Sequence, residues 1–141
     1  MDNTYPIIYV EKPEQSVWGL IGKGLNDYNI QQAGDDKAQR ICFAVQGPDQ
    51  EIVGGVVAAV YWDWLYIDLM WLEEEYRKCG YGSRLLTLVE AEARRRGAKH
   101  AYLDTFSFQA PDFYKKHGYQ VFGELRDFPP GHQRYFLTKE L

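Results

Sequence analysis

The sequence predicts an α/β protein of the mixed (α+β) type, in which a central, mostly antiparallel, twisted sheet of about six to seven strands is flanked by helices. Short runs rich in β-branched and aromatic residues alternate along the chain with segments whose apolar residues recur at helical spacing. Three strand candidates follow one another directly, and a helix, a strand, a helix and two further strands come after them. This order favours a mixed sheet with helices packed on it.

The first half of the chain contains a helix and four strand candidates. Pro13 and Glu14 open the helix, whose apolar residues recur at helical spacing; these are Val17, Trp18, Ile21, Leu25 and Tyr28. The strand candidates span residues 7–10, 41–46, 52–62 and 65–72. Gly47-Pro48-Asp49-Gln50 separates the second from the third, and such a turn between two β-rich runs favours a hairpin.

The second half contains an amphipathic helix over residues 83–96, which Gly97 ends. Its apolar side carries Leu85, Leu86, Val89 and Ala93. Its other side carries two pairs spaced four residues apart, Glu90 with Arg94 and Glu92 with Arg96. The elements that follow are a strand over 99–105, a short helix over 111–117 closed by Gly118, and strands over 119–126 and 133–139.

Length and composition predict one cytoplasmic domain over residues 1–141. A net charge of −4 gives no broad attraction to phosphate backbones or anionic lipid, so neither nucleic acid nor membrane is expected as a partner. Cys42 and Cys79 lack zinc-ligand spacing, which predicts free thiols and no metal. No basic segment leads into an apolar one at the start, and no apolar run approaches the length of a membrane span.

The segment from Leu72 to Ser83 predicts a phosphate-binding loop between a strand and a helix. Gly80 and Gly82 allow tight backbone conformations in which several amide N–H groups point at one anion. The free N–H groups and the positive dipole end of the following helix reinforce the same place. Arg77 and Lys78 add positive charge. The loop is not of the Walker type, because no Gly-Lys-Ser/Thr follows.

Here the sequence resembles the GNAT acetyltransferases, whose pyrophosphate loop reads Arg/Gln-x-x-Gly-x-Gly/Ala and is matched by Arg77, Gly80 and Gly82. Ala110-Pro111-Asp112-Phe113-Tyr114-Lys115-Lys116-His117-Gly118-Tyr119 is similar to the family's Ala-x-x-Phe-Tyr-x-x-x-Gly-Phe/Tyr helix. The resemblance implies a GNAT-like fold, acetyl-CoA as co-substrate without a metal, and N-acetyltransferase activity. It is also compatible with assembly of the protein into a homodimer. It implies cofactor contacts at Trp71, Leu72, Arg77, Lys78, Cys79, Gly80, Tyr81, Gly82, Ser83, Ser107 and Tyr114.

The same resemblance implies individual roles. Unpaired backbone groups near Trp71 and Leu72 would hold the pantetheine and the acetyl carbonyl, and one N–H would act as an oxyanion donor. Ser107 stands where family members often carry Asn, and its hydroxyl reaches less far than an amide. Tyr114 would act as a general acid toward the departing sulfur.

An amine of the lysine type has a pKa of about 10.4 and must lose a proton on the enzyme, so a base is needed. Asp68 is the first candidate, because it interrupts an apolar strand. The alternatives are Asp63, Glu73, Asp104 and His132.

The acceptor pocket is expected across the opening of the sheet, with one wall formed by the loop 127–132 and flat walls from aromatic residues. The aromatic candidates are Trp18, Tyr28, Trp62, Trp64 and Phe106. The leading hypothesis is direct attack of a primary amine, from a small molecule or a peptide, on acetyl-CoA in a ternary complex. Alternatives are a non-catalytic acyl-CoA-binding or sensor module on the same fold, and a partner-binding protein whose glycine loop is only a turn.

Overall fold

The computed structural model describes residues 4–12 and 15–141, which form two compact units, Met1–Asp36 and Lys37–Leu141. The first unit contains the helix α1 (Gln15–Ala33), which confirms the predicted helix from Gln15 onward. The predicted start at Pro13 and Glu14 lies outside the described residues. Gly34 follows the helix with a φ of 83°, and its N–H donates to the carbonyl of Ile30 at 2.8 Å. A glycine in the left-handed conformation is a common helix end.

The predicted strand over residues 7–10 is wrong, because these residues lie in no strand. A strand exists only where a neighbouring strand accepts its backbone hydrogen bonds. A four-residue apolar run indicates that its side chains are compatible with a strand, but it does not indicate whether a partner strand is present. The sheet therefore has the lower of the two expected strand numbers.

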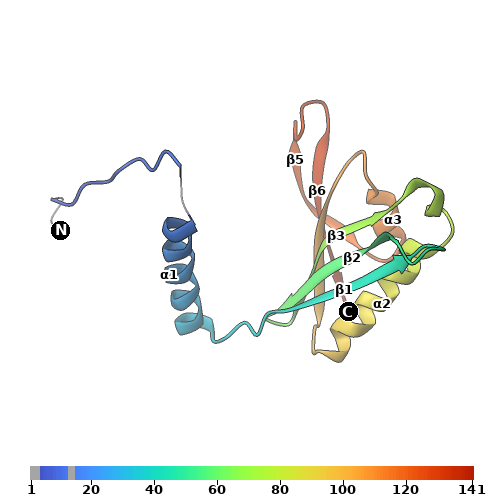
Figure 1. Cartoon of the computed structure of the whole chain (residues 1–141), viewed down its shortest axis with the longest axis horizontal. Helices are drawn as coiled ribbons and strands as arrows, with labels where there is room; N and C mark the ends of the chain where they lie inside the picture. Colours follow the sequence, from blue (N-terminus) through green and yellow to red (C-terminus); the bar gives the residue numbers. More distant parts are fainter. Residues whose placement is uncertain (1–3, 13–14) are drawn as a thin grey trace. The chain divides into compact units, whose positions relative to one another are not determined.

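Within residues 37–141, all of which the structure describes, six strands form one sheet in the order β1-β2-β3-β4-β6-β5 (Figure 1). They are β1 (Gln39–Gln46), β2 (Ile52–Tyr61), β3 (Trp64–Leu72), β4 (His100–Phe106), β5 (Gln120–Arg126) and β6 (Gln133–Glu140). Only β3 and β4 pair in parallel, so the predicted mixed, mostly antiparallel sheet is confirmed. Trp62 and Asp63 join β2 to β3 with φ angles of 45° and 64°, as a two-residue hairpin loop of the type I′ class requires.

Two α-helices of this unit, α2 (Tyr81–Arg95) and α3 (Pro111–Lys116), confirm the predicted ones. A short 3₁₀ helix, η1 (Glu74–Tyr76), precedes the glycine loop and was not predicted. The apolar side of α2 is buried as expected, against inward-facing residues of the sheet. These include Val56, Ala58, Leu65, Ile67, Leu103 and Leu137.

Side chains alternate between the two faces of a strand, so Tyr61, Tyr66, Tyr102, Asp104, Phe136 and Thr138 lie on the other face of the sheet, here called the open face.

Glu90 differs from its predicted setting. It lies 3.9 Å from Arg94, so the expected pair exists, but Glu90 is only 5% exposed instead of facing solvent. Its carboxylate accepts hydrogen bonds from the Tyr119 hydroxyl at 2.8 Å and the Lys139 ammonium at 3.0 Å. Spacing along one helix identifies neighbours on that helix, whereas burial depends on which strand packs over it.

Candidate active site

The strands β3 and β4 separate part of the way along the sheet. They pair from Trp64 with His100 to Ile67 with Leu103, and no pairing continues toward Leu72 and Phe106. The β2–β3 ladder is irregular at the same level, because Ile67 pairs with Ala58 and Leu69 pairs with Val57. Asp68 is therefore the extra residue of a β-bulge, a feature that often re-aims a side chain at the edge of a site.

Backbone groups of β3 face this opening. The N–H of Glu73, just after β3, donates to the carbonyl of Val53 on β2 at 2.8 Å, so these two residues form a hydrogen-bonded pair. Because such pairs alternate along an antiparallel ladder, Trp71 also pairs with β2, while the N–H and C=O groups of Met70 and Leu72 point away from it. The Arg77 side chain confirms this direction, since its Nε donates to the Leu72 carbonyl at 2.9 Å. The opening thus offers backbone groups of Leu72, as expected, and of Met70, which the sequence analysis missed.

The glycine loop that follows has the geometry of an anion site. Lys78 and Gly80 have φ angles of 59° and 88°, and the first bond of α2 runs from the Arg84 N–H to the Gly80 carbonyl at 3.1 Å. The N–H groups of Tyr81, Gly82 and Ser83 therefore precede the first helical hydrogen bond, where helix N-termini bind phosphates. A Cβ at Gly80 would meet nothing within 4 Å, so its backbone angle, and not space, calls for glycine.

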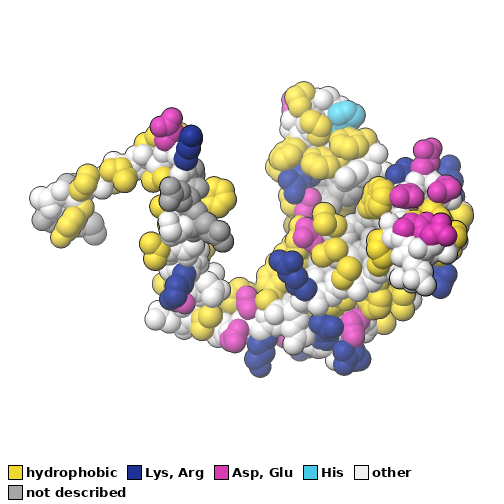
Figure 2. Space-filling model, viewed as in Figure 1, with side chains coloured by type: hydrophobic (Ala, Val, Ile, Leu, Met, Phe, Trp, Pro, Cys, Tyr) yellow, Lys and Arg dark blue, Asp and Glu magenta, His cyan; other side chains and the backbone are white. Residues whose placement is uncertain are grey.

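Charged side chains surround the loop. Arg77 and Lys78 are exposed, and the Cys79 thiol donates to the Arg77 carbonyl at 3.3 Å. Glu74 and Glu75 precede them in η1 and are also exposed, and Figure 2 shows acidic and basic side chains gathered at this end of the unit. An anion held here is bound mainly by backbone N–H groups, with the basic side chains free to adjust.

The helix α3 is fixed to the first turn of α2. A Cβ placed on Gly82 would lie 3.3 Å from two ring atoms of Phe113, so the backbone at Gly82 packs directly against that ring. Ser83 Oγ lies 3.0 Å from His117 Nε2, and the His117 ring lies 4.8 Å from the Phe113 ring. The glycine loop and the helix that bears Tyr114 are thus one packed element. His117 was missed, because no short-range pattern links it to Ser83.

Tyr114 lies on α3 with only 8% of its surface exposed. The rings of Phe113 and Tyr119 stand edge-on to it, with ring centres 5.2 Å and 6.0 Å away. Burial, followed by the negative charge of Asp104, raises the pKa of Tyr114 to about 12. The phenol therefore keeps its proton at any pH at which an amine acceptor begins to lose its own.

Ser107 is engaged with β6. Its N–H donates to the Gln133 carbonyl at 2.8 Å, and its Oγ accepts from the Gln133 N–H at 3.1 Å. Ser107 therefore extends the β4–β6 ladder by one residue. Its hydroxyl hydrogen is still able to donate to a ligand, since a serine hydroxyl is both donor and acceptor.

The candidate bases differ in their surroundings. Asp68 is exposed and has no ion-pair partner among the described residues. Asp104 accepts hydrogen bonds from Arg134 Nε at 2.9 Å and Nη2 at 2.6 Å, so its charge is largely compensated. Asp63 lies in the β2–β3 turn, and the His132 ring stands edge-on to Phe108 at 5.1 Å. Of the charged candidates, Asp68 alone combines a bulged strand position with the strand opening.

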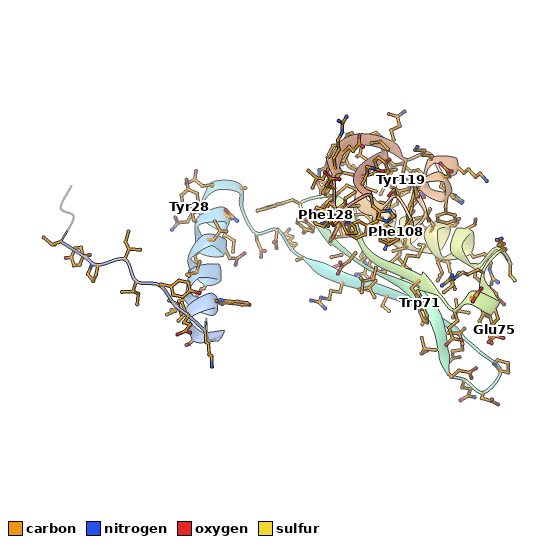
Figure 3. All side chains as sticks on the ribbon, turned by 90° about the horizontal axis from the view of Figure 1, so that it is seen from above. Tyr28, Trp71, Glu75, Phe108, Tyr119 and Phe128 are labelled. Atoms are coloured by element: carbon orange, nitrogen blue, oxygen red, sulfur yellow. The ribbon has the colours of Figure 1, made fainter. Side chains whose placement is uncertain are left out.

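The predicted aromatic walls fall into separate groups. Arg134 stands over the rings of Phe106, Phe128 and Phe136 at 5.4, 5.0 and 5.4 Å, and Phe108 stacks on Phe106 at 5.3 Å. Figure 3 shows Phe108 and Phe128 close together in this group, so the loop 127–132 does contribute an aromatic residue. Trp62 and Trp64 line a different hollow, and Trp18 and Tyr28 belong to α1 in the other unit.

Residues 4–12 and 15–141 contain no group of three or more His, Cys, Asp or Glu side chains that could hold a metal ion. Both cysteines are free. Over the same described ranges, no helix is long and apolar enough to cross a bilayer.

Comparison with known proteins identifies the family. The model of the acetyltransferase (GNAT) family matches residues 8–119. Blasticidin-S acetyltransferase from Streptomyces morookaense is 42% identical over 96 residues, which cover 67% of this chain and 71% of that protein. An acetyltransferase of Agrobacterium fabrum is 30% identical over 112 residues, covering 79% of this chain and 82% of that protein. The crystal structure of an acetyltransferase from Bacillus cereus is 35% identical, with a TM-score of 0.87 over 95% of this chain and 98% of that chain.

The chain therefore belongs to the GNAT family, and the resemblance and the fold expected from its motifs are confirmed. It is an N-acetyltransferase, which moves an acetyl group from acetyl-CoA to an amine. The two non-catalytic alternatives receive no support from these matches, since the relatives are named as acetyltransferases.

Proposed function

We propose that this enzyme acetylates a primary amine of a small, cationic natural product, in the substrate class that blasticidin S represents. The observation that carries the proposal is the opening between β3 and β4 beside the glycine loop, with Asp68 exposed on a bulge at its edge. The relative named blasticidin-S acetyltransferase, at 42% identity, supports the substrate class. An amine acceptor also fits the exposed carboxylate of Asp68, because a carboxylate without an ion-pair partner attracts an ammonium.

In this proposal the pyrophosphate of acetyl-CoA binds at the N-terminus of α2. The backbone N–H groups from Cys79 to Ser83 donate to its oxygens, and Arg77 and Lys78 add charge from the rim. The pantetheine arm extends along β3, where Met70 offers its backbone groups and Leu72 its N–H, and the Trp71 side chain, which is 55% exposed, offers an apolar surface. Ser107 donates from the opposite strand.

The chemistry follows from this placement. The neutral amine attacks the thioester carbonyl carbon, a C–N bond forms, and the C–S bond breaks to release the thiolate of CoA. The Leu72 N–H donates to the carbonyl oxygen as negative charge develops there. Asp68, directly or through water, accepts the proton that the ammonium form of the acceptor loses before the attack, and the nitrogen releases its second proton to solvent after the C–N bond has formed.

Tyr114 acts on the sulfur in this scheme. Moving a proton from a phenol with a pKa of about 12 to a thiolate with a pKa near 8.5 is uphill by an amount on the order of 5 kcal/mol. We therefore assign Tyr114 as a hydrogen-bond donor that stabilises the departing thiolate, which then takes its proton from solvent. This modifies the general-acid role expected from the sequence.

The setting of the reaction follows from its substrates. We place it in the cytoplasm, where acetyl-CoA is available, and we expect no nucleic-acid acceptor, because the net charge is −4. A homodimer stays a prediction, and sedimentation of the purified protein checks it.

A panel of acceptors tests the proposal. The wild-type enzyme is incubated with acetyl-CoA and each acceptor, and released CoA and the acetylated product are measured. The panel contains blasticidin S, aminoglycosides, polyamines, amino acids and lysine peptides. We expect saturable acetylation of blasticidin S or of another small-molecule amine in the panel. A clear preference for lysine peptides would contradict the small-molecule class.

A further inference from the structure

A second feature of the open face lies apart from the strand opening. It is a hollow of about 420 Å³ lined by Tyr61, Trp62, Trp64, Tyr102, Phe122 and Thr138, here called the aromatic hollow. Its volume falls within the range of small-molecule sites, roughly 300 to 1,000 Å³. Apart from Thr138, the lining residues are all aromatic, and the Tyr61 and Tyr102 hydroxyls are hydrogen-bonded to each other.

A row of aromatic rings connects the hollow with the opening. Trp64 stands edge-on to Tyr102 at 5.9 Å, and Tyr102 stacks on Tyr66 at 4.8 Å. Tyr66 is two residues before Asp68 on β3. Since a strand rises about 3.3 Å per residue, the four residues from Trp64 to Asp68 span roughly 13 Å. The hollow therefore lies roughly 13 Å along β3 from the proposed base, a distance that one extended small molecule can span.

Phe122 provides independent support. In the β5–β6 ladder Val121 pairs with Leu137 and Gly123 pairs with Phe136, so Phe122 is the extra residue of a bulge. Val121 lies opposite the core residue Leu137, so the next side chain, Phe122, points to the open face, where it is 62% exposed and lines the hollow. Asp68 and Phe122 thus both lie on the open face beside an irregularity of their ladders, a carboxylate at the strand opening and a phenyl ring at the hollow. Large exposed aromatic groups that line a concave surface are typical of ligand sites.

We infer that the aromatic hollow binds a flat, unsaturated ring at the far end of the amine acceptor, about 13 Å from the reacting nitrogen. The inference rests on the proposed function and specifies its acceptor as an elongated molecule. Indole and phenol rings stack on flat ligands, and a ring that carries positive charge gains a further cation–π attraction.

A series of primary amines tests this inference. Each compound carries a naphthyl ring at the end of an alkyl spacer of increasing length, and each is matched by a plain alkylamine of the same length. With the wild-type enzyme we expect kcat/KM of the ring-bearing series to pass through a maximum where the spacer spans about 13 Å, and the plain series to show no such maximum. A kcat/KM that is independent of the ring and of the spacer would overturn the inference.

Two variants locate the effect. Trp64→Leu and Phe122→Ser should each raise KM of the best ring-bearing amine about 10-fold, because that factor corresponds to about 1.4 kcal/mol, near the upper end of what one aromatic stacking contact contributes. The KM of the matched plain amine and the Kd of CoA should stay within about twofold. Val121→Ser is the control, since Val121 is exposed, precedes Phe122 and does not line the hollow. Equal changes for both amines, or the same change in the control, would overturn the inference.

Calorimetric binding separates this inference from the proposed function. If wild-type enzyme acetylates none of the amines, but binds the ring-bearing ones more tightly than Trp64→Leu does, the proposed function fails and the ring site stands. If it acetylates them while Trp64→Leu binds them equally well, the ring site fails and the proposed function stands. If neither activity nor ring-dependent binding is found, both are wrong.

Discussion

Tyr114 and Asp68 show how the setting of a single residue decides what it can do. Tyr114 is buried beneath aromatic rings with a pKa raised to about 12. Asp68 is exposed on a bulge, where no basic side chain among the described residues neutralises it. The departing sulfur needs a hydrogen-bond donor, which Tyr114 supplies from the helix-covered side, and the attacking amine needs a proton acceptor, which Asp68 supplies on the open face.

Replacing Tyr114 with Phe removes one hydroxyl and little volume, so the fold and CoA binding should persist. The single-turnover rate of acetyl transfer should fall roughly 10- to 1000-fold, because the lost hydrogen bond is strongest when the sulfur is negative. The wild-type rate should show no decline from ionisation of this phenol below about pH 11, since the pKa is about 12. An unchanged chemical step in a folded Tyr114→Phe enzyme would refute the role.

Asp68→Asn keeps the shape of the side chain and removes its basicity. We expect kcat/KM to fall at neutral pH and the deficit relative to wild type to shrink as the pH approaches the pKa of the free amine, about 10.4 for a lysine-type acceptor. The reason is that an already neutral amine needs no base. Asp63→Asn, in the β2–β3 turn, is the matched control. A pH-independent deficit would indicate a binding role for Asp68 instead.

Glu90→Ala tests the buried carboxylate. It removes the partner of Lys139 and Tyr119 and leaves a cation and a hydroxyl in a largely buried place, which should cost about 3 kcal/mol of unfolding free energy. Denaturant unfolding measures it. Glu92→Ala, whose Arg95 and Arg96 pairs lie at the surface, should change stability far less. Equal losses of unfolding free energy in the two variants would show that the buried contacts of Glu90 stabilise the fold no more than a surface ion pair does.

At the level of elements, the contact between α2 and α3 joins cofactor binding to the leaving-group side. Ser83 belongs to the turn whose N–H groups face the anion site, and His117 ends the helix that carries Tyr114. The packing of Phe113 on Gly82 is the second contact between the two helices. Displacing one helix should therefore alter the other.

A double-mutant cycle measures this coupling. Ser83→Ala and His117→Leu should each weaken CoA binding several-fold, and the double variant should be hardly worse than either single one, because both remove the same 3.0 Å hydrogen bond. Calorimetry provides the affinities. Lys116→Ala, an exposed neighbour on α3, is the control. Fully additive losses would mean that the two side chains act independently.

For the whole molecule, the prediction concerns ligand-linked stability. CoA binds only the native state, so a concentration 100 times its Kd should add about 2.7 kcal/mol to the unfolding free energy and raise the Tm. Arg77→Ala should reduce this gain only in part, since backbone N–H groups supply most of the donors and the Arg77 side chain already contacts the Leu72 carbonyl. No rise of the Tm at saturating CoA would contradict the cofactor site.

The sequence by itself determined most of the elements and the family. The apolar period of Leu85, Leu86, Val89 and Ala93 predicts α2 and its buried side, because helix periodicity is local. Gly80 marks the left-handed start of α2, since backbone angles depend on the residue itself. Local chemistry of this kind can be read along the chain without knowing what lies across from it.

Only the tertiary structure decided the contacts between distant segments. The bulges at Asp68 and Phe122 are properties of a ladder, which needs the partner strand to define it. The burial of Glu90 depends on Lys139, and the position of His117 depends on Ser83. The strand expected at residues 7–10 was wrong for the same reason, since hydrophobic character makes a strand feasible, whereas only pairing creates one.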